Sequence, residues 1–433
     1  MNGKLDALVN AKAGLVNRSI FIDEDIYKQE LEQVFGRCWL FIGHESQVAK
    51  PNDFTASYMG EDPILLTRDG KGNLHAFLNM CRHRGNRICR ADAGNAPSFM
   101  CTYHGWTFAT DGKLVGVPGY KEAYFEELDR SQWGLVEARL DSYKGLVFAT
   151  WDKQAPSLAD YLGDAAWYLD LLLDRREAGT EIQAGVHKWV LDANWKFGAD
   201  NFGGDNYHFS LTHGSNFPPQ VLTLLNEMMQ DPGTHSVTTN GHGILCAYDG
   251  ALPTNPLLDS FPHDYQKYFK EHLPELEQRL GAFRKKQASM NIATLFPNFT
   301  WHVGPMVRMW HPRGPHKTEI WTYSIVDKKA PQWARDAMRR NLNFTFGPAG
   351  AYEQDDMNNW IQCTSTASSR IARQYDMSIQ LGLGHEKRHE LLPGTLSQNI
   401  SETNQRAFYG RWAEIMDAPS WSQVKMEPRS AKY

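Results

Sequence analysis

The chain has 433 residues, 42% of them hydrophobic and 22% charged, and a formal net charge of −5. This length predicts two or three domains, and the composition is typical of soluble globular proteins. Acidic and basic residues are interspersed, which excludes the basic patch that nucleic acids or anionic membranes require. The chain shows no export signal and no apolar stretch of the ~20 residues that span a bilayer, so we expect a cytoplasmic protein.

The pattern of apolar residues and turns changes twice along the chain. Apolar residues recur at helical spacing over 20–37, with Asp23 as a candidate N-cap. Over 38–156, short β-rich runs alternate with turns such as RDGKGN. Over 157–433, strands such as TLFPNFTWHV and TEIWTYSIV mix with stretches that we expect to be helical, at 158–174, 330–346 and 402–417. We therefore expect an α+β protein. Residues 1–37 would form a helical segment packing on the larger domain, 38–156 a small all-β domain, and 157–433 an α+β domain whose antiparallel sheet is surrounded by helices.

The all-β segment carries two mixed motifs, Cys81-x-His83 and, after seventeen further residues, Cys101-x-x-His104. Each motif follows a β-rich run and precedes a glycine, so two tight loops would each present one thiolate and one imidazole. Two Cys and two His are the ligands of a Rieske [2Fe–2S] cluster, whose imidazoles raise the potential above that of all-Cys ferredoxins. A structural zinc site is the alternative, but zinc fingers usually pair two Cys in one half and two His in the other.

A second group of metal-binding residue types lies in the larger domain. His208 and His213 are five positions apart, which corresponds to about 140° on an ideal helix, so one regular helical face cannot hold both on one metal. A π-turn or a helix end between them would bring them together, and Gly214 favours an ending. Asp205, three positions before His208, would share its face.

The third ligand of such a site must come from another segment. The candidates are Asp355 and Asp356, in the run GPAGAYEQDD. Two His and one carboxylate leave open positions on Fe(II) for O₂, which is the pattern of oxygen-activating non-haem iron. The spacing of the two His is weak evidence alone and gains its weight from the cluster motif upstream.

One further motif points to different chemistry. His385-Glu-Lys-Arg-His389 matches the H-E-x-x-H signature of zinc proteases. Gly382 and Gly384 precede it and Pro393 follows, which leaves fewer than three helical turns, and no third ligand is near in sequence. A solvated surface segment is the better interpretation, and a protease is rejected.

These motifs together resemble a known family. CRHRG followed by CTYHGW, the run D-x₂-H-x₄-H, GPAGAYEQDD, DYLGDAAWYL and SETNQRAFYGRW are similar to the large (α) subunits of Rieske non-haem iron aromatic-ring-hydroxylating dioxygenases, naphthalene type. The resemblance runs nearly end to end. It implies that Cys81 and Cys101 bind one iron of the cluster, and that His83 and His104 bind the other.

The resemblance also implies roles around a mononuclear iron. The second acidic residue of the pair is the family's ligand, so Asp356 would bind iron with His208 and His213, with Asp355 as the runner-up. Asp205 matches the residue that links an iron-bound His to a Rieske His of the neighbouring subunit. Electrons would then cross between chains from His104 to His208. Asn201 matches a residue near the iron.

The substrate pocket follows from the same resemblance. Five positions match pocket-lining ones, although ordinary core packing would also explain them: Met290, Ile292, Leu295, Phe346 and Tyr352. The resemblance implies cis-dihydroxylation with O₂ as co-substrate, and these side chains favour an apolar mono- or polycyclic arene. The alternatives are a substituted or carboxylated arene, and a Rieske monooxygenase or O-demethylase. A non-catalytic electron carrier would have no use for His208, His213 or the long chain after the cluster domain.

Partners are implied as well. The chain has neither a dinucleotide-binding glycine fingerprint nor a P-loop, so NAD(P)H must act through a separate reductase, with a ferredoxin. Arg82, Arg84, Arg87 and Arg90 crowd the first cluster loop, where they would either receive an acidic ferredoxin or form internal ion pairs. The family assembles as rings of three α-subunits, either α₃ or α₃β₃ with a small β-subunit.

Overall fold

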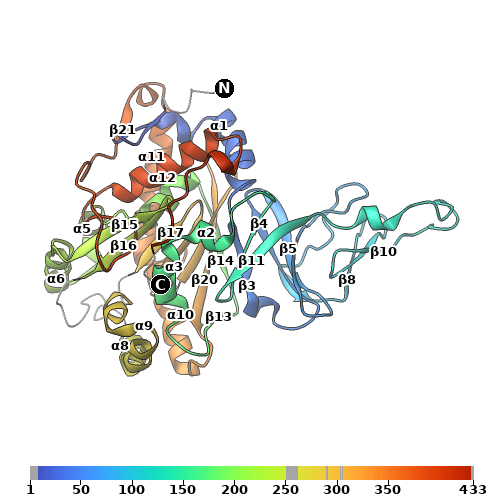
Figure 1. The fold of residues 1–433 in the computed structure, drawn as a ribbon, viewed down its shortest axis with the longest axis horizontal. Helices are drawn as coiled ribbons and strands as arrows, with labels where there is room; N and C mark the ends of the chain where they lie inside the picture. Colours follow the sequence, from blue (N-terminus) through green and yellow to red (C-terminus); the bar gives the residue numbers. More distant parts are fainter. Residues whose placement is uncertain (1–7, 250–261, 289–290, 303, 305, 431–433) are drawn as a thin grey trace. The chain divides into compact units, whose positions relative to one another are not determined.

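The computed structural model describes residues 8–249, 262–288, 291–302, 304 and 306–430. The chain divides into two compact units (Figure 1). The smaller unit is Phe35–Ala155, and the larger unit combines Met1–Val34 with Pro156–Tyr433. In the part of the chain that is described, no helix is long and apolar enough to cross a membrane.

The smaller unit is built from antiparallel strands, which confirms the expected all-β class. Its seven-stranded sheet has the order β3-β12-β11-β6-β5-β4-β7, and a separate three-stranded sheet has the order β10-β9-β8. The strands are β3 (Leu40–His44), β4 (Asp53–Met59), β5 (Asp62–Arg68), β6 (Leu74–Leu78), β7 (Ala93–Asn95), β8 (Ser98–Met100), β9 (Thr107–Ala109), β10 (Leu114–Gly116), β11 (Glu137–Tyr143) and β12 (Leu146–Thr150). The two cluster motifs lie between β6 and β7 and between β8 and β9.

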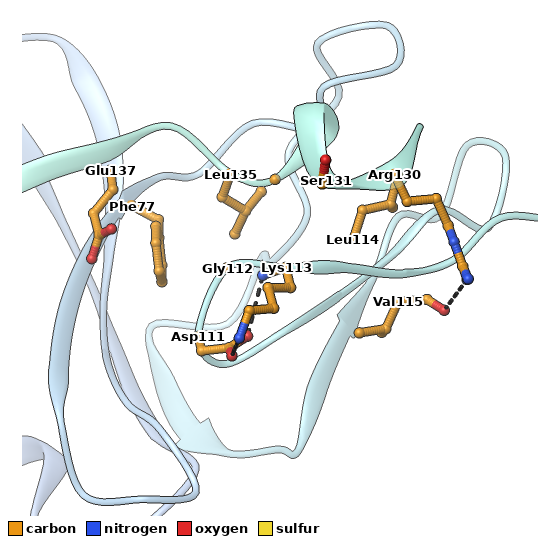
Figure 2. Close-up of a pocket in the computed structure, with 11 residues that line it drawn as sticks. Phe77, Asp111, Gly112, Lys113, Leu114, Val115, Arg130, Ser131, Leu135 and Glu137 are labelled. Atoms are coloured by element: carbon orange, nitrogen blue, oxygen red, sulfur yellow. Dashed lines mark hydrogen bonds and ion pairs between the residues drawn. The ribbon is translucent and has the colours of Figure 1, made fainter. Parts of the chain in front are cut away.

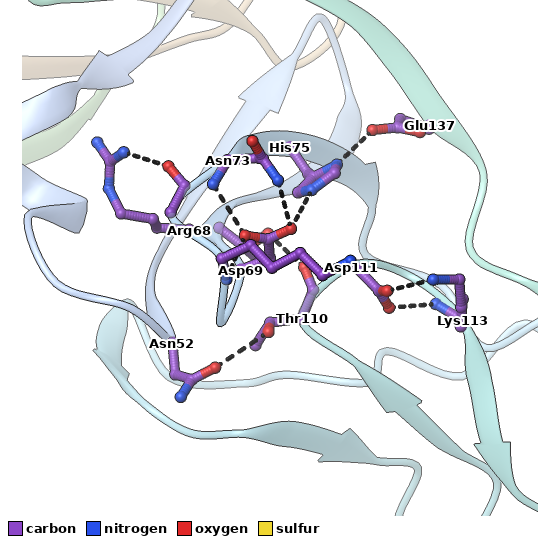
Figure 3. Close-up of polar contacts among 12 residues, drawn as sticks. Asn52, Arg68, Asp69, Asn73, His75, Thr110, Asp111, Lys113 and Glu137 are labelled. Atoms are coloured by element: carbon purple, nitrogen blue, oxygen red, sulfur yellow. Dashed lines mark hydrogen bonds and ion pairs between the residues drawn. The ribbon is translucent and has the colours of Figure 1, made fainter.

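A polar network holds the turn between β5 and β6 (Figure 3). Asp69 Oδ1 accepts hydrogen bonds from the backbone N–H groups of Lys71 and Asn73, both at 2.8 Å. Asp69 Oδ2 lies 3.2 Å from His75 Nε2, whose Nδ1 lies 2.7 Å from a carboxylate oxygen of Glu137. Burial alone would raise the pKa of Asp69, but its hydrogen bonds hold it well below the usual value. The network therefore ties the start of β6, which leads to the first cluster loop, to β11.

The larger unit is organised around an antiparallel sheet of nine strands, as expected. Eight strands follow the order β13-β20-β19-β18-β17-β16-β15-β22, and β14 also pairs with β20. The strands are β13 (Thr180–Ile182), β14 (His187–Leu191), β15 (Thr234–Thr239), β16 (His242–Tyr248), β17 (Ile292–Leu295), β18 (Phe299–His302), β19 (Met306–Pro312), β20 (Thr318–Asp327) and β22 (Thr395–Gln398). A small sheet joins β1 (Val9–Asn10), β2 (Leu15–Asn17) and β21 (Asp376–Ser378).

Helices pack on this sheet and carry the site residues. They are α1 (Glu24–Glu30), α2 (Leu158–Leu162), α3 (Ala165–Leu173), α4 (Trp195–Phe202), α5 (Phe209–Thr212), α6 (Pro219–Met229), α8 (His263–Glu271), α9 (Leu273–Gln287), α10 (Gln332–Thr345), α11 (Ala351–Ala367) and α12 (Thr403–Asp417). Helix α4 contacts strands β16 to β19, and α12 contacts β15 and β16. The segment after α4 and the first half of α11 supply the candidate iron ligands.

The N-terminal segment is anchored by one buried carboxylate. Asp23 caps α1 by accepting hydrogen bonds from the N–H groups of the first turn, as predicted. The helix is shorter than the 20–37 pattern, because Leu31–Phe35 continue it as a π-helix. Glu30 is fully buried, pairs with Lys196, and accepts hydrogen bonds from the indoles of Trp195 (3.1 Å) and Trp412 (2.8 Å). This segment is therefore held by a satisfied buried charge as well as by apolar contact.

Two predicted elements are divided in the structure. The run TLFPNFTWHV is not one strand but the hairpin β17–β18, because Pro297, which has no N–H, lies between them. The helical stretch over 158–174 breaks at Gly163, whose φ of +49° is unfavourable for residues with a side chain. The predicted helices over 330–346 and 402–417 are present as α10 and α12.

Candidate active site

The two cluster loops share one backbone geometry. In the first, Cys81 N–H donates to Asn86 O at 2.8 Å, and Gly85 N–H donates to Cys81 O at 2.9 Å. The second loop repeats both distances at Cys101 and Gly105. The two glycines have φ values of +77° and +74°, a region in which a side chain would be strained. Each glycine therefore allows the tight turn that brings one thiol and one imidazole to the same loop tip.

The four predicted cluster ligands lie on these two loops. Cys81 and Cys101 are buried, and the rings of His83 and His104 are 4.5 Å apart. Among the described residues, His83 Nδ1 is buried without a hydrogen-bond partner. Burial, His104 and Arg84 lower the pKa of His83, so the ring is neutral, as a metal ligand must be. An orphaned ring nitrogen beside two buried thiols fits a Rieske cluster.

Hydrogen-bond donors also surround one thiol. Burial alone would raise the pKa of Cys101, but the backbone N–H of Tyr103 and the side chain of Asn86 lower it. The amide nitrogen of Asn86 lies 3.5 Å from Cys101 Sγ. Donors aimed at a thiolate stabilise its charge, and in iron–sulfur proteins such bonds tune the cluster's potential.

The mononuclear iron candidates converge in the larger unit. His208 and His213 lie at the two ends of the short helix α5, so a helix end separates them, as the spacing predicted. Their Nε2 atoms are 3.2 Å apart. Oδ1 of Asp356, from α11, lies 3.3 Å from Nε2 of His208 and 3.2 Å from Nε2 of His213. Three ligand atoms thus form a nearly equilateral triangle.

This triangle has the chemistry of a cation site. Asp356 Oδ1 is buried and has no hydrogen-bond partner among the described residues. Three lone-pair atoms this close repel one another unless a proton or a cation lies between them, and a point about 2 Å from all three is available, as metal–nitrogen and metal–oxygen bonds require. Two His and one carboxylate fit Fe(II) with open positions for O₂.

The outer nitrogens of both histidines face carboxylates. Asp205 Oδ1 accepts the backbone N–H of Tyr207 at 3.1 Å and of His208 at 3.2 Å, and Asp205 Oδ2 lies 3.5 Å from His208 Nδ1. The amide nitrogen of Asn201 is 3.4 Å from the same Nδ1. Burial would lower the pKa of His208, but Asp205 and Asp356 raise it to about 10. The site therefore carries excess negative charge that favours a cation.

The structure separates the roles of the two adjacent aspartates. Asp355 lies outside the triangle, with Oδ2 at 3.5 Å from His213 Nδ1, and its carboxylate accepts a 2.8 Å hydrogen bond from Asn216. A carboxylate on the outer nitrogen of a ligand His fixes the ring's orientation and tautomer. This arrangement for Asp355 was not predicted, because neighbouring acidic residues on a helix point in different directions that sequence alone does not assign.

A second unpredicted pair positions the helix that carries Asp356. Arg308 on β19 is fully buried and lies 2.8 Å from a carboxylate oxygen of Glu353 on α11, which is also fully buried. The same guanidinium donates to Phe346 O at 2.8 Å and to Thr322 Oγ1 at 2.7 Å. Burial raises the pKa of Glu353 to about 7 against the opposing effect of Arg308. The pair fixes the first turn of α11 on the sheet.

Aromatic and apolar side chains border the triangle. Phe217, Leu225 and Leu245 form a buried cluster against which Ile292 and Tyr352 pack. The Tyr352 ring lies 5.3 Å from that of His213, and the ring of Phe346 lies 5.7 Å from that of Tyr352. Three of the five predicted pocket residues are thus brought together next to the candidate ligands.

The other two predicted pocket residues are not placed with them. Leu295 follows Ile292 by three positions on β17, so strand alternation turns it to the opposite face of the sheet. Met290 lies outside the described residues. His302, directly opposite Ile292 on β18, is a neighbour that the sequence did not reveal. The signal that could have found it is the two-residue period of the FTWH run.

A hollow in the smaller unit and the H-E-x-x-H segment contribute no residue to the candidate site. The smaller unit has an open hollow of about 570 Å³ lined by charged residues such as Asp111, Lys113, Arg130 and Glu137, and no predicted site residue lines it (Figure 2). The H-E-x-x-H segment is not helical, and Glu386 forms an ion pair with Arg406 at 2.6 Å. Rejection of the zinc protease is therefore consistent with the geometry.

Comparisons with known proteins place this arrangement in a family. Residues 158–418 match the ring-hydroxylating α-subunit catalytic domain, and residues 38–143 match the Rieske [2Fe–2S] domain. The chain is 40% identical over 427 residues to the biphenyl 2,3-dioxygenase α-subunit of Rhodococcus jostii (strain RHA1), covering 96% of this chain and 92% of that protein. It is 38% identical over 434 residues to a benzene 1,2-dioxygenase α-subunit of Pseudomonas putida, covering 98% and 95%.

Solved structures agree with these relatives. Naphthalene 1,2-dioxygenase with indole bound in its active site has a TM-score of 0.88 at 31% identity, covering 98% of this chain and 97% of that one. Naphthalene 1,2-dioxygenase from Rhodococcus sp., bound to indole, has a TM-score of 0.83 at 35% identity, covering 94% and 95%. This chain belongs to the ring-hydroxylating dioxygenase α-subunit family. It is an oxidoreductase with a Rieske [2Fe–2S] cluster and a mononuclear iron, and it uses O₂ and electrons from partner proteins.

Proposed function

We propose that this chain catalyses cis-dihydroxylation of an apolar mono- or polycyclic arene. The observation that carries the proposal is the triangle of His208, His213 and Asp356 bordered by aromatic side chains. Two relatives are named as dioxygenases of biphenyl and of benzene, and both names support the same substrate class. The overall reaction adds both atoms of O₂ to adjacent ring carbons as hydroxyl groups, and it consumes two protons and two electrons, the electrons delivered from NAD(P)H through a reductase and a ferredoxin.

In this proposal each unit has its own role. Residues 38–156 form the cluster domain, with Cys81 and Cys101 on one iron and His83 and His104 on the other. Residues 157–433 form the catalytic domain, on which residues 1–37 pack, with the triangle holding the second iron. When bound, the cluster supplies electrons singly and the mononuclear iron activates O₂.

The protein side chains supply orientation and a dry environment. Asp205 and Asp355, at the outer nitrogens, hold the two His rings with their Nε2 atoms converging. Burial raises the pKa of Tyr352 to about 12, so the phenol stays neutral beside the arene. Arg308 is paired with Glu353 at 2.8 Å, which reduces the counter-charge that it can offer to a carboxylated substrate. These features favour an uncharged arene over the carboxylated alternative.

We also propose that the catalytic assembly is a ring of α-subunits, α₃ or α₃β₃. Asp205 keeps 35% of its side chain exposed while its carboxylate contacts His208, so a group from another chain can reach it. The predicted bridge runs from His104 of the partner subunit through Asp205 to His208. Such a bridge orients both rings and shortens the path that an electron must cross.

The first cluster loop suits an acidic electron donor. Arg82 donates to Gly134 O at 2.9 Å and Arg87 to the Tyr58 hydroxyl at 3.2 Å. In the described part of the chain, no carboxylate forms an ion pair with these two residues or with Arg84 and Arg90. Of the two predicted alternatives, ferredoxin binding is therefore favoured over internal ion pairs.

The bridging role is tested by Asp205→Ala, with the exposed Asp264→Ala as a matched control. After anaerobic purification and reconstitution with excess Fe(II), both variants should contain two irons and two sulfides for the cluster and one further iron, as the wild type does. With excess ferredoxin, reductase and NADH, Asp205→Ala should lose arene turnover although its cluster is still reduced, because the link between chains is cut. Normal electron transfer to the second iron in this variant would exclude the bridge.

A further inference from the structure

His302 borders the aromatic surroundings of the candidate iron site. On the sheet its cross-strand neighbours are Ile292 and Met306, and paired residues face the same side. Ile292 packs against the apolar cluster that also contacts Tyr352. The His302 ring lies 5.1 Å from the ring of Phe346. The imidazole is therefore part of the same wall as the predicted pocket residues.

The tautomer of His302 is set by its backbone. The N–H of Gly304 donates to His302 Nδ1 at 2.7 Å, so the neutral ring carries its proton on Nε2. Burial and the nearby Arg308 lower the pKa of His302 to about 3, so the ring is neutral under ordinary conditions. His302 is 4% exposed, and among the described residues no acceptor receives the Nε2–H. Nε2 itself keeps some access to solvent, so its N–H can be reached by a ligand.

We propose that His302 is a specificity-determining residue, whose Nε2–H donates a hydrogen bond to a neutral acceptor on the arene, a carbonyl or ether oxygen. This inference rests on the proposed function and narrows its substrate class to largely apolar arenes with one such oxygen. The rest of the wall is aromatic and apolar, which suits the ring system. A carboxylate is a poorer ligand, because one neutral donor does not offset the cost of burying its charge.

The test is an internal competition between 9-fluorenone and fluorene, two arenes of nearly the same shape that differ in the carbonyl. Holoenzyme with ferredoxin, reductase and NADH receives both in equal amounts, and the ratio of their consumption gives the ratio of kcat/KM. This ratio does not depend on how much enzyme is folded or iron-loaded. His302→Leu should lower the fluorenone-to-fluorene ratio about 5- to 10-fold relative to wild type, as expected for one lost hydrogen bond.

Two further variants separate hydrogen bonding from packing. His302→Gln keeps a donor and should restore part of the preference, whereas Met306→Leu changes the apolar neighbour and should leave the ratio within twofold of wild type. The ratio of the two dissociation constants, measured by quenching of tryptophan fluorescence, should shift in the same direction as the consumption ratio: His302→Leu should weaken binding of 9-fluorenone more than binding of fluorene. An unchanged ratio in His302→Leu, by both consumption and binding, overturns the role of His302.

The same experiment distinguishes this failure from that of the proposed function. If the wild type consumes arenes and His302→Leu keeps the ratio, arene oxidation stands and the specificity proposal falls. If the wild type consumes no arene although both iron centres are loaded, the proposed function falls. The binding ratio then decides on His302 by itself.

Discussion

The two metal-binding regions are assembled in opposite ways. The cluster ligands come from two loops of the smaller unit that repeat the same backbone hydrogen bonds, each closed by a glycine of positive φ. The mononuclear ligands come from a short helix and from α11, which are far apart in sequence, and depend on a sheet that joins them. Local turns can form a cluster site, but only a complete tertiary core can bring His208, His213 and Asp356 together.

The surroundings of the two sites differ for the same reason. Backbone N–H groups near the cluster loops supply donors to the thiols within a few residues. At the mononuclear site the supporting groups lie on separate elements: Asp205 before α5, Asp355 on α11, and the Arg308–Glu353 pair between β19 and α11. We therefore expect the second site to be more sensitive to substitutions elsewhere in the fold.

The largest expected effect comes from removing one ligand of one metal centre, which should leave the other metal centre intact. Asp356→Ala should abolish arene turnover and binding of the mononuclear iron, because two ring nitrogens remain without a carboxylate, while the visible spectrum of the cluster stays unchanged. Cys101→Ser removes a thiolate ligand of the cluster, so the cluster and its visible spectrum should be lost while the mononuclear iron stays bound; turnover should stop here too, because no electrons reach that iron. Iron and acid-labile sulfide per chain, read with the visible spectrum, check both. Loss of the cluster in Asp356→Ala would contradict independent assembly.

The next effect concerns the stability of the larger unit, which contains the mononuclear site. Glu30→Ala removes one partner of a buried ion pair and leaves the ammonium of Lys196 uncompensated, which should cost about 3–5 kcal/mol of unfolding free energy. Urea unfolding followed by tryptophan fluorescence measures it, and visible absorbance reports the cluster unit separately. The exposed neighbour Glu32→Ala is the control and should stay within about 0.5 kcal/mol of wild type. Equal losses in the two variants would show that the buried pair has no special role.

A smaller effect tests the support of one iron ligand. Asp355→Ala should weaken Fe(II) binding about 10- to 100-fold without removing a ligand, because His213 loses the carboxylate that orients its ring. Asp264→Ala, in an exposed ion pair, provides the control. Titration of iron-depleted protein with Fe(II) gives the affinities. Complete loss of binding in Asp355→Ala would instead point to Asp355 as a direct ligand.

The last effect, spread over more than two pH units, is a dependence of stability on pH in the larger unit. His242 is buried as a neutral ring, with Nδ1 accepting from Phe296 N–H at 2.9 Å and Nε2 2.8 Å from Tyr161 O. Burial lowers the pKa of His242 to about 4, below the value of about 6.5 in the unfolded chain. Its contribution is therefore complete above pH 6.5 and is lost as the pH falls towards 4, with a slope of at most about 1.4 kcal/mol per pH unit.

Urea unfolding at several pH values measures this slope. His242→Gln should flatten the dependence between pH 6.5 and 4, and the exposed His316→Gln should leave it as in the wild type. If His242→Gln keeps the full slope, the acid sensitivity arises from other groups.

The sequence determined those features whose causes are local. The alternation of β-rich runs and turns predicted the all-β unit, and the paired Cys-x-His and Cys-x-x-His motifs placed four ligands on two loops, because each loop closes over about six residues. The Asp23 cap and the helices over 330–346 and 402–417 follow from capping and from the helical period. The five-residue spacing of His208 and His213 already called for a π-turn or a helix end between them, and Gly214 favoured the helix end.

Only the tertiary structure decided the choices that depend on distant elements. Asp355 and Asp356 are adjacent in sequence, and the packing of α11 through Arg308 and Glu353 sets which carboxylate faces the histidines. Likewise, Leu295 and Ile292 looked equivalent as apolar residues, but the register of β17 with β18 turns them to opposite faces and brings His302 beside Ile292. Side-chain direction across a sheet is fixed by pairing and packing, which a single segment does not contain.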